Sequence, residues 1–326
     1  MRTPEYISPT SLALFFEDRT EFYLRYLADN RPPRIPQNRP MAIGSAFDAY
    51  IKSYIDKALF GRTEFEFETL FEKQVEPQNR DWALKHGKIA FGQYIKTGAL
   101  ADLMLELGKA SHTPRLESEV RDTVNICGTP IPLLGKPDLY FIIDGKFQVI
   151  FDWKLNGYCS NGTTSPKPGY VMVRGNWGRD NGTWHKDAQL IQIHGISVNA
   201  ATTLEQIEES WARQIYTYAR VLGEDNGGDY IAGIEQLACK PEGTGDDRFV
   251  NIRTASFRSR IGKEYQDAID KQLIICWTAL QTGHIFTDLS AEDNKSRCEL
   301  LDNYHKAYSG EGPNEDWFKS ITRGEA

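Results

Sequence analysis

The first 115 residues carry apolar side chains at the spacing of amphipathic helices. One helix is predicted over 8–27, where a Ser-Pro pair suits the N-cap and first turn, and a second over 43–55. Residues 64–110 are also predicted to be mostly helical, with breaks at Gly87, Gly92 and Gly98. We therefore expect a mainly helical N-terminal part over 1–115.

From residue 116 onward the pattern changes to short apolar runs typical of strands, followed by a return of helical spacing. The predicted strands cover 119–124, 131–143, 147–155, 230–239 and 249–257. The later predicted helices cover 204–222, 263–281 and 292–308. This order predicts an α/β protein with a mixed central β-sheet flanked by helices, and with helical additions at both ends.

Two aspartates interrupt the apolar strands at the centre of this core. Asp138 follows Pro137, whereas Asp152 and Lys154 lie two residues apart on the returning strand and so share one face. A three-residue loop over 144–146 would set Asp138 opposite Asp152, and a two-residue loop would turn the two side chains to opposite faces. We predict the three-residue loop or an equivalent bulge.

These three side chains suit the hydrolysis of a phosphodiester. A carboxylate in an apolar strand loses hydration, and a divalent cation is the usual compensation. We expect Asp138 and Asp152 to bind one or two Mg²⁺ or Mn²⁺ ions, with the backbone carbonyl of Trp153 as a further oxygen ligand. Lys154 would orient the attacking water or stabilise the phosphate in the transition state.

With these motifs, the chain resembles a RecB-like exonuclease of the PD-(D/E)xK nuclease superfamily. That branch includes the CRISPR-associated adaptation nucleases and many phage recombination nucleases. The resemblance spans roughly residues 8–258, with 50–115 weakly covered. The matching blocks are 8–12 with 22–26, 44–48, 135–138, 152–154 and 214–218.

The resemblance implies roles for residues outside the predicted hairpin. Asp48 stands where the family has a histidine metal ligand, and an oxygen ligand suits Mg²⁺ at least as well. Glu119 falls where many members carry a further acidic metal ligand, with Glu117 as the competing candidate. Gln214 and Tyr218, four apart on one helix face, match the family's QxxxY motif, which positions DNA or the catalytic lysine. Asp48 and Glu119 also have an ordinary alternative, as charged residues on exposed faces.

The resemblance further implies a PD-(D/E)xK restriction-endonuclease-like core and a single nuclease domain over 1–326. Within it, the catalytic core would cover 116–258, with a long insertion loop over 159–186, and C-terminal helices would cover 259–326. The iron–sulfur cluster of some relatives is not expected. Glu17 and Asp18 stand near the place of its first cysteine, only Cys298 remains of the others, and four thiolates are needed.

The function implied is that of a Mg²⁺- or Mn²⁺-dependent DNA exonuclease. Its substrate would be linear DNA with single- or double-stranded ends, in recombination, repair or phage DNA processing. A recombination or single-strand-binding protein is a candidate partner. The alternatives are a catalytically inactive DNA-end-binding or assembly module with the same fold, and a restriction-type endonuclease.

Two basic segments, the proline-rich loop over 30–40 and the loop over 159–186, are candidate DNA-binding regions. The loop over 159–186 carries a net charge of +3, from four basic residues and one aspartate, and interleaves them with aromatic residues. This alternation suits backbone contact and base stacking on single strands, and a solvated insertion is the alternative. The candidate residues are Arg31, Arg34, Arg39, Lys167, Arg174, Trp177, Arg179 and Lys186.

Composition adds limits on class and location. The formal net charge of −7 does not exclude nucleic-acid binding, because a local basic groove can work on an acidic protein. The five cysteines show no metal-ligand spacing. No run reaches the roughly 18 apolar residues of a membrane span, and the first residues do not resemble a signal peptide. We therefore expect a cytoplasmic protein, bacterial or in the host cytoplasm if phage-encoded, with no membrane partner.

Overall fold

The structure, a computed structural model, divides into two compact units. Unit 1 contains residues 1–34, 120–135 and 266–326, and unit 2 contains residues 35–119 and 136–265. The single domain over 1–326 stays a prediction. The residues that the structure describes are 3–29, 35–61, 65–145, 147–175, 183–184, 188–223, 230–245 and 248–303.

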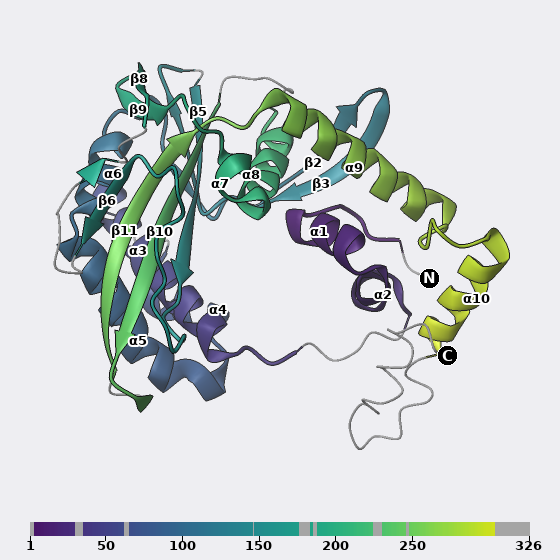
Figure 1. Ribbon diagram of the computed structural model, residues 1–326, viewed down its shortest axis with the longest axis horizontal. Helices are drawn as coiled ribbons and strands as arrows, with labels where there is room; N and C mark the ends of the chain where they lie inside the picture. Colours follow the sequence, from purple (N-terminus) through teal and green to yellow (C-terminus); the bar gives the residue numbers. More distant parts are fainter. Residues whose placement is uncertain are drawn as a thin grey trace. The chain divides into compact units, whose positions relative to one another are not determined.

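Unit 2 is an α/β structure built on a mixed sheet, as predicted (Figure 1). Strand β5 is parallel to β10, and every other neighbouring pair in the sheet is antiparallel. The two-residue strand β7 (Thr183–Trp184) lies at one edge, after β6. The other six strands follow the order β1 (Arg115–Leu116), β4 (Leu139–Ile143), β5 (Phe147–Asn156), β10 (Tyr230–Glu242), β11 (Phe249–Ser259) and β6 (Met172–Gly175).

Helices cover both faces of this sheet (Figure 1). On one side, apolar residues of α3, α5 and α6 form a core with alternate residues of β5, among them Phe151 and Trp153. On the other side lies α8 (Glu209–Val221). The residues of β5 between those core positions, Asp152 and Lys154, point to the side of α8 because successive strand residues face opposite ways. The remaining helices of unit 2 are α3 (Arg39–Phe60), α4 (Phe67–Gln74), η2 (Pro77–Asn79), α5 (Arg80–Lys96), α6 (Ala99–Leu107) and α7 (Leu204–Ile207).

Helix boundaries in unit 2 follow local chemistry except where tertiary packing prevails. The side chain of Asn38 caps α3, and Gly98 separates α5 from α6 with a φ of 84°, as predicted. The breaks predicted at Gly87 and Gly92 are wrong, since both lie inside α5. At Gly87 a Cβ atom would come within 2.6 Å of the Ala46 Cβ, so this glycine allows α3 and α5 to approach closely.

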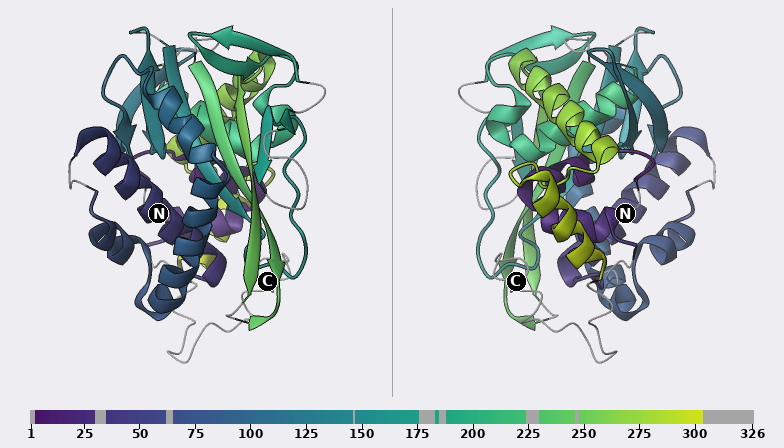
Figure 2. Two further views of the ribbon diagram at one scale, coloured as in Figure 1. Left: turned by 90° about the vertical axis from the view of Figure 1, so that its left-hand side faces the viewer. Right: turned by 90° about the vertical axis from the view of Figure 1, so that its right-hand side faces the viewer.

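The two long strands β10 and β11 run side by side through unit 2 (Figures 1 and 2). Their pairing extends over eleven residue pairs, from Ala232 opposite Ser259 to Glu242 opposite Phe249. The sequence analysis missed four short strands between β5 and α7. These are β6, β7, β8 (Leu190–Ile193) and β9 (Ile196–Asn199), the last two forming a separate hairpin.

Unit 1 contains the N-terminal helices and a β-hairpin. Ser8 caps α1 (Pro9–Glu17), as predicted, but the helix expected over 8–27 is interrupted at Asp18. This residue is extended, with φ −152° and ψ 98°, and its side chain caps the next helix. The other elements are α2 (Arg19–Phe22), the π-helix η1 (Tyr23–Leu27), β2 (Val120–Ile126), β3 (Thr129–Gly135) and α10 (Ala291–Asp302).

The strand predicted over 131–143 is split into β3 and β4 by residues 136–138. Proline at 137 has no N–H to donate to a ladder, which favours an interruption there. Helix α9 (Lys263–Thr282) matches its prediction closely and contributes to both units. The helix predicted to reach residue 308 ends at Asp302, and residues 304–326 lie outside the described part. None of the described helices is long and apolar enough to cross a membrane.

Candidate active site

The β4–β5 hairpin brings the two predicted aspartates together. Ile143 pairs with Phe147, so the connecting loop consists of residues 144–146, and the predicted three-residue loop is confirmed. Because Leu139 pairs with Phe151, the same register carried one step further sets Asp138 beside Asp152. Their carboxyl groups share a hydrogen bond, and the Trp153 N–H donates to Asp138 Oδ2 at 3.1 Å.

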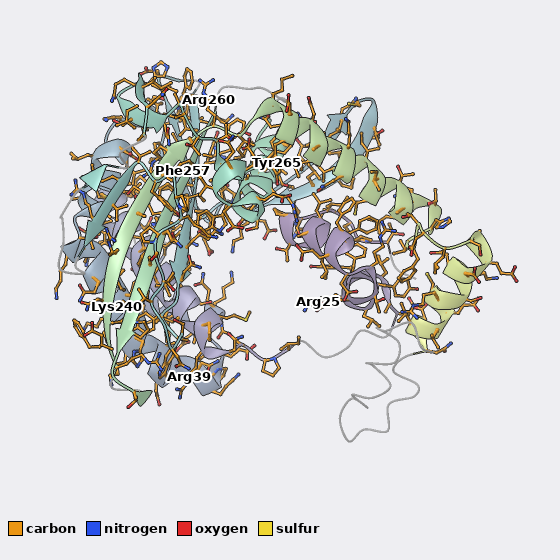
Figure 3. The ribbon with its side chains drawn as sticks, in the orientation of Figure 1. Arg25, Arg39, Lys240, Phe257, Arg260 and Tyr265 are labelled. Atoms are coloured by element: carbon orange, nitrogen blue, oxygen red, sulfur yellow. The ribbon has the colours of Figure 1, made fainter. Side chains whose placement is uncertain are left out.

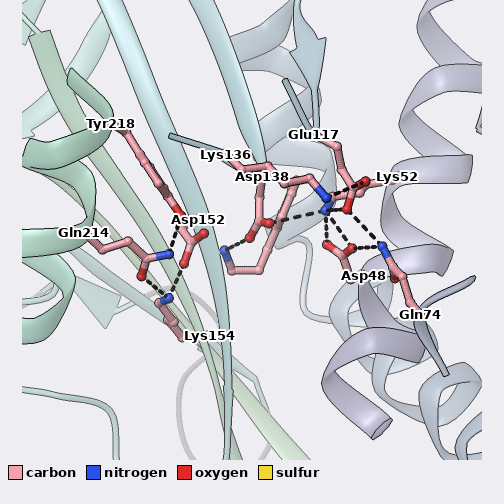
Figure 4. A network of polar contacts seen from close by, with 11 residues as sticks. Asp48, Lys52, Gln74, Glu117, Lys136, Asp138, Asp152, Lys154, Gln214 and Tyr218 are labelled. Carbon is pink, nitrogen blue, oxygen red and sulfur yellow. Dashed lines mark hydrogen bonds and ion pairs between the residues drawn. The ribbon is translucent and has the colours of Figure 1, made fainter. Parts of the chain in front are cut away.

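A chain of polar contacts links this pair to helix α8 (Figure 4). The ammonium of Lys154 forms an ion pair with Asp152 and donates a hydrogen bond to Gln214 Oε1 at 2.8 Å. The amide of Gln214 donates in turn to the Tyr218 hydroxyl at 2.8 Å. Tyr218 is buried, whereas the side chain of Lys154 is 21% exposed, so the lysine can reach a bound ligand. The structure thus assembles the five residues predicted as catalytic.

A buried lysine lies on the other side of Asp138 (Figure 4). Lys52, one turn after Asp48 on α3, is 1% exposed. Its Nζ donates to Asp48 Oδ2 at 2.6 Å, to Glu117 Oε1 at 2.9 Å and to Asp138 Oδ1 at 3.3 Å. We call Asp48, Glu117, Asp138 and Asp152 the carboxylate cluster. The sequence analysis missed Lys52, although its (i, i+4) spacing from Asp48 indicated an ion pair.

The structure favours Glu117 over Glu119 as the additional acidic residue. Glu117 follows β1 with a φ of 47°, and its carboxylate also pairs with Lys136 Nζ at 3.1 Å. Gln74, the last residue of α4, donates from Nε2 to Glu117 Oε1 at 2.9 Å and to Asp48 Oδ2 at 3.0 Å. Glu119 is exposed just before β2.

Burial and charge distribute the protons unevenly over the cluster. Burial raises the pKa of Asp48 to about 7, against the effect of Lys52, with further increase from Asp138. Burial also raises the pKa of Asp152 well above its usual value, assisted by the negative charge of Asp138. For Asp138, burial is outweighed by Lys52, Lys154 and hydrogen bonds from Asp152 and the Trp153 N–H, which lower its pKa. Of this pair, Asp152 therefore binds a proton more readily than Asp138.

Lys52 keeps its charge although it is buried. Burial alone lowers the pKa of an ammonium, but Asp138, Asp48 and Glu117 together raise the pKa of Lys52 above its usual value. The pKa of Glu117 is lowered by Lys52 and Lys136, which outweigh the effect of its burial. One buried ammonium is therefore shared by three carboxyl groups on this side of Asp138.

The cluster has the donor chemistry of a divalent-cation site without its spacing. Among the described residues, no three His, Cys, Asp or Glu side chains are placed to hold a metal ion as they stand. The ammonium of Lys52 lies between the oxygens of Asp48, Glu117 and Asp138 instead. Carboxylate oxygens are nevertheless the ligands that Mg²⁺ and Mn²⁺ prefer, so the residue types fit these ions. The role of the Trp153 carbonyl as a ligand stays a prediction.

A second buried network lies on the opposite face of β5, next to the site. The indole N–H of Trp153 donates to the Tyr94 hydroxyl at 3.3 Å, and this hydroxyl donates to Glu235. Arg258 donates to Glu235 Oε1 at 3.2 Å and to Glu106 Oε2 at 2.8 Å. Burial raises the pKa of Glu235 to about 7, although Arg258 acts to lower it. This network fixes the strand that carries Asp152 and was not predicted from the sequence.

The described members of the predicted DNA-binding set have local partners. Arg39 is exposed at the start of α3, with its guanidinium 5.2 Å from the centre of the Trp82 ring (Figure 3). Lys167 pairs with Glu208 at 2.8 Å, and Arg174 pairs with Asp102 at 3.0 Å. The other members, Arg31, Arg34, Trp177, Arg179 and Lys186, lie outside the described residues.

Comparison with known proteins gives little beyond this geometry. No family model matches the sequence, and no curated protein is similar to it. A solved structure described as that of SSO0001 is similar over 81% of this chain and 85% of its own, at 9% sequence identity and a TM-score of 0.24. A likeness at that score carries no argument about fold or activity.

Proposed function

We propose that this protein is a metal-dependent deoxyribonuclease with a PD-(D/E)xK restriction-endonuclease-like core, similar to RecB-like exonucleases. One observation carries the proposal. Asp138, directly before β4, converges with Asp152 and Lys154 on the neighbouring β5, although thirteen residues separate the two aspartates. The hydrogen bonds from Lys154 to Gln214 and from Gln214 to Tyr218 support it, because they hold the lysine at the carboxyl pair.

The residues of the site have separable tasks under this proposal. Lys154 donates from Nζ to a non-bridging oxygen of the scissile phosphate, and its charge stabilises the negative charge that develops there. Gln214 fixes the direction of that ammonium, and Tyr218 fixes Gln214. A hydrogen bond joins the carboxyl groups of Asp152 and Asp138, and Asp152 binds the proton more readily. To act as ligands of a divalent ion, the pair would release this proton to water.

The residues that would hold Mg²⁺ or Mn²⁺ are Asp48, Asp138 and Asp152, with Glu117 in the place first assigned to Glu119. Bound there, such an ion would supply positive charge beside the phosphate and would lower the pKa of a water molecule, which favours attack of that water on phosphorus. The substrate class rests on the resemblance to RecB-like exonucleases. The proposed substrates are the ends of linear DNA in recombination, repair or phage DNA processing. The proposed location is a bacterial or phage-infected cytoplasm. A recombination or single-strand-binding protein is the partner that such a role entails.

A second candidate function is DNA-end binding or assembly without turnover. The observation that favours it is the ammonium of Lys52, which already compensates the carboxylates that a catalytic ion would need. A protein that had lost metal binding would keep its fold in this way and could still bind DNA. A restriction-type endonuclease is the remaining alternative, and it differs from an exonuclease in its action on closed circles.

Cleavage assays on matched substrates test the proposal. Purified protein is incubated with linear and covalently closed circular DNA of one sequence, with Mg²⁺, Mn²⁺ or EDTA. We expect the metals to support degradation of the linear form alone. Lys154→Ala should reduce the rate by about 10²–10³-fold, the usual loss when one transition-state donor is removed. Lys240→Ala, in a partly exposed lysine on neighbouring β10, should leave the rate unchanged.

The outcomes separate the candidates. Full cleavage by Lys154→Ala, with the melting temperature of the wild type, would reject the assignment of the active site. Cleavage of circles at the same rate as linear DNA would indicate an endonuclease. Binding of linear DNA in a gel-shift assay, with no cleavage in either metal, would favour the module without turnover.

A further inference from the structure

We propose that Lys52 is a built-in cation, which fills the carboxylate cluster in the metal-free protein and has to leave it when a divalent ion binds. The inference rests on the proposed function, because it concerns the same metal site. It goes beyond that function by assigning a competitor for the metal within the chain. No motif used to recognise the site includes this lysine.

The ammonium of Lys52 lies among three members of the carboxylate cluster. An ammonium has three N–H donors, and the three carboxylates that Lys52 contacts come from three separate segments of unit 2. Asp48 lies on α3, Glu117 follows β1, and Asp138 precedes β4. Their oxygens surround Nζ at 2.6 to 3.3 Å, and the side chain is 1% exposed. A divalent ion in contact with the same oxygens would need distances of about 2.0–2.6 Å, so the two cations exclude each other.

The charge of the carboxyl groups also favours a cation at this position. Lys52 contributes one positive charge at the meeting point of three carboxyl groups, and a buried carboxylate without a compensating charge is strongly unfavourable. A divalent ion contributes twice that charge at shorter range. It can therefore displace the ammonium, but only against the three hydrogen bonds that Lys52 makes. The metal-free site remains folded, and its affinity for free metal is reduced.

The side-chain amide of Gln74 also contacts the cluster. In the described part of the chain, Gln74 Oε1 is buried without a hydrogen-bond partner, while Nε2 of the same amide donates to Asp48 and Glu117. Rotation of the amide by half a turn would exchange the two atoms and direct an oxygen at the cluster. An oxygen is unfavourable beside carboxylates alone and favourable beside a divalent ion. The amide of Gln74 is thus placed to become a ligand when the ion enters.

Direct titration with Mn²⁺ tests the competition without DNA. Calorimetry would compare the wild type with Lys52→Met, which keeps an unbranched side chain and removes the charge. We expect Lys52→Met to bind Mn²⁺ more tightly by about tenfold or more, because the repulsion between two cations a few ångströms apart is removed. Lys136→Met is the matched control, since Lys136 pairs with the same Glu117 but is 45% exposed. Its affinity should change by less than about threefold.

Thermal unfolding gives a second readout, the stability of the protein with and without the ion. Without Lys52 the carboxylates lack a cation, so Lys52→Met should melt well below the wild type in EDTA. Saturating Mn²⁺ should restore most of that loss, and it should raise the melting temperature of the wild type and of Lys136→Met much less. Equal Mn²⁺ affinity of the wild type and Lys52→Met would overturn the inference. So would a Lys52→Met protein that stays unfolded in Mn²⁺, because the ion would then not replace the ammonium.

These results are separable from the proposed function. Rescue of Lys52→Met by Mn²⁺ in a protein that cuts no DNA would keep the inference and reject the nuclease. Metal-dependent cleavage by the wild type, with no effect of Lys52→Met on Mn²⁺ affinity, would keep the nuclease and reject the inference.

Discussion

Replacing Arg258 with methionine is expected to lower the free energy of unfolding by about 3–5 kcal/mol at pH 8. The guanidinium is 4% exposed and pairs with Glu106 and Glu235. Glu106, at 19% exposure, can be hydrated when its partner is removed. Glu235, at 0% exposure, cannot, so the expected loss arises mainly from this one carboxylate. Because the same network holds Trp153 through Tyr94, the variant should also loosen the strand that carries Asp152 and Lys154.

The loss of unfolding free energy in Arg258→Met should increase as the pH rises. Burial raises the pKa of Glu235 from 4.5 to about 7, so the folded protein keeps a proton that the unfolded chain releases. The stabilisation that comes from this bound proton is fully present below pH 4.5 and is lost as the pH rises to about 7. Without Arg258 the pKa of Glu235 rises further, and the loss continues above pH 7 at about 1.4 kcal/mol per pH unit. The difference between Arg258→Met and wild type should therefore grow by about 2–3 kcal/mol from pH 7 to pH 9.

Urea titrations at pH 7, 8 and 9 measure these differences. The double variant Arg258→Met with Glu235→Gln should recover most of the loss, because its buried amide carries no charge. Arg25→Met is the control, since Arg25 is 44% exposed and pairs with Glu21 on a helix surface. It should change stability by less than about 1 kcal/mol. A loss below about 1 kcal/mol for Arg258→Met, or one that is the same at pH 7 and pH 9, would refute the reasoning.

Two further predictions concern the site. Gln214→Leu should reduce DNA cleavage by about 10- to 100-fold, because Lys154 loses a hydrogen bond of about 1.5–3 kcal/mol that orients it; an unchanged rate on linear DNA would show that Gln214 does not position the lysine. Asp48 has its pKa raised from 3.8 to about 7 by burial, so its contribution to stability is lost as the pH rises between these values. Asp48→Asn should therefore flatten the dependence of melting temperature on pH in EDTA, and an unaltered slope would contradict this.

The hairpin at the centre of the site was predictable because its signals are local. Short apolar runs indicated the two strands, and the loop length then fixed which residues stand opposite each other. The same local rules failed at Gly87, where the close approach of α3 to α5 requires a small residue inside a helix. They also failed for β6 to β9, which are short strands stabilised by pairing with each other and with β11. The local pattern of apolar and polar residues does not predict which strands pair with each other.

The contacts of Lys52, which determine the chemistry of the site, could not be predicted from the sequence. Asp48 and Lys52 form a spacing that on most helices marks a solvated surface pair. The chain brings Glu117 and Asp138 to this lysine from 65 and 86 residues away. Because Lys52 is buried, its ammonium compensates charge within the cluster instead of forming a solvated pair on the helix surface. The folded arrangement of these residues therefore determines whether a divalent ion can replace the ammonium. A nuclease and an inactive relative would differ in the proposed exchange of Lys52 for Mn²⁺.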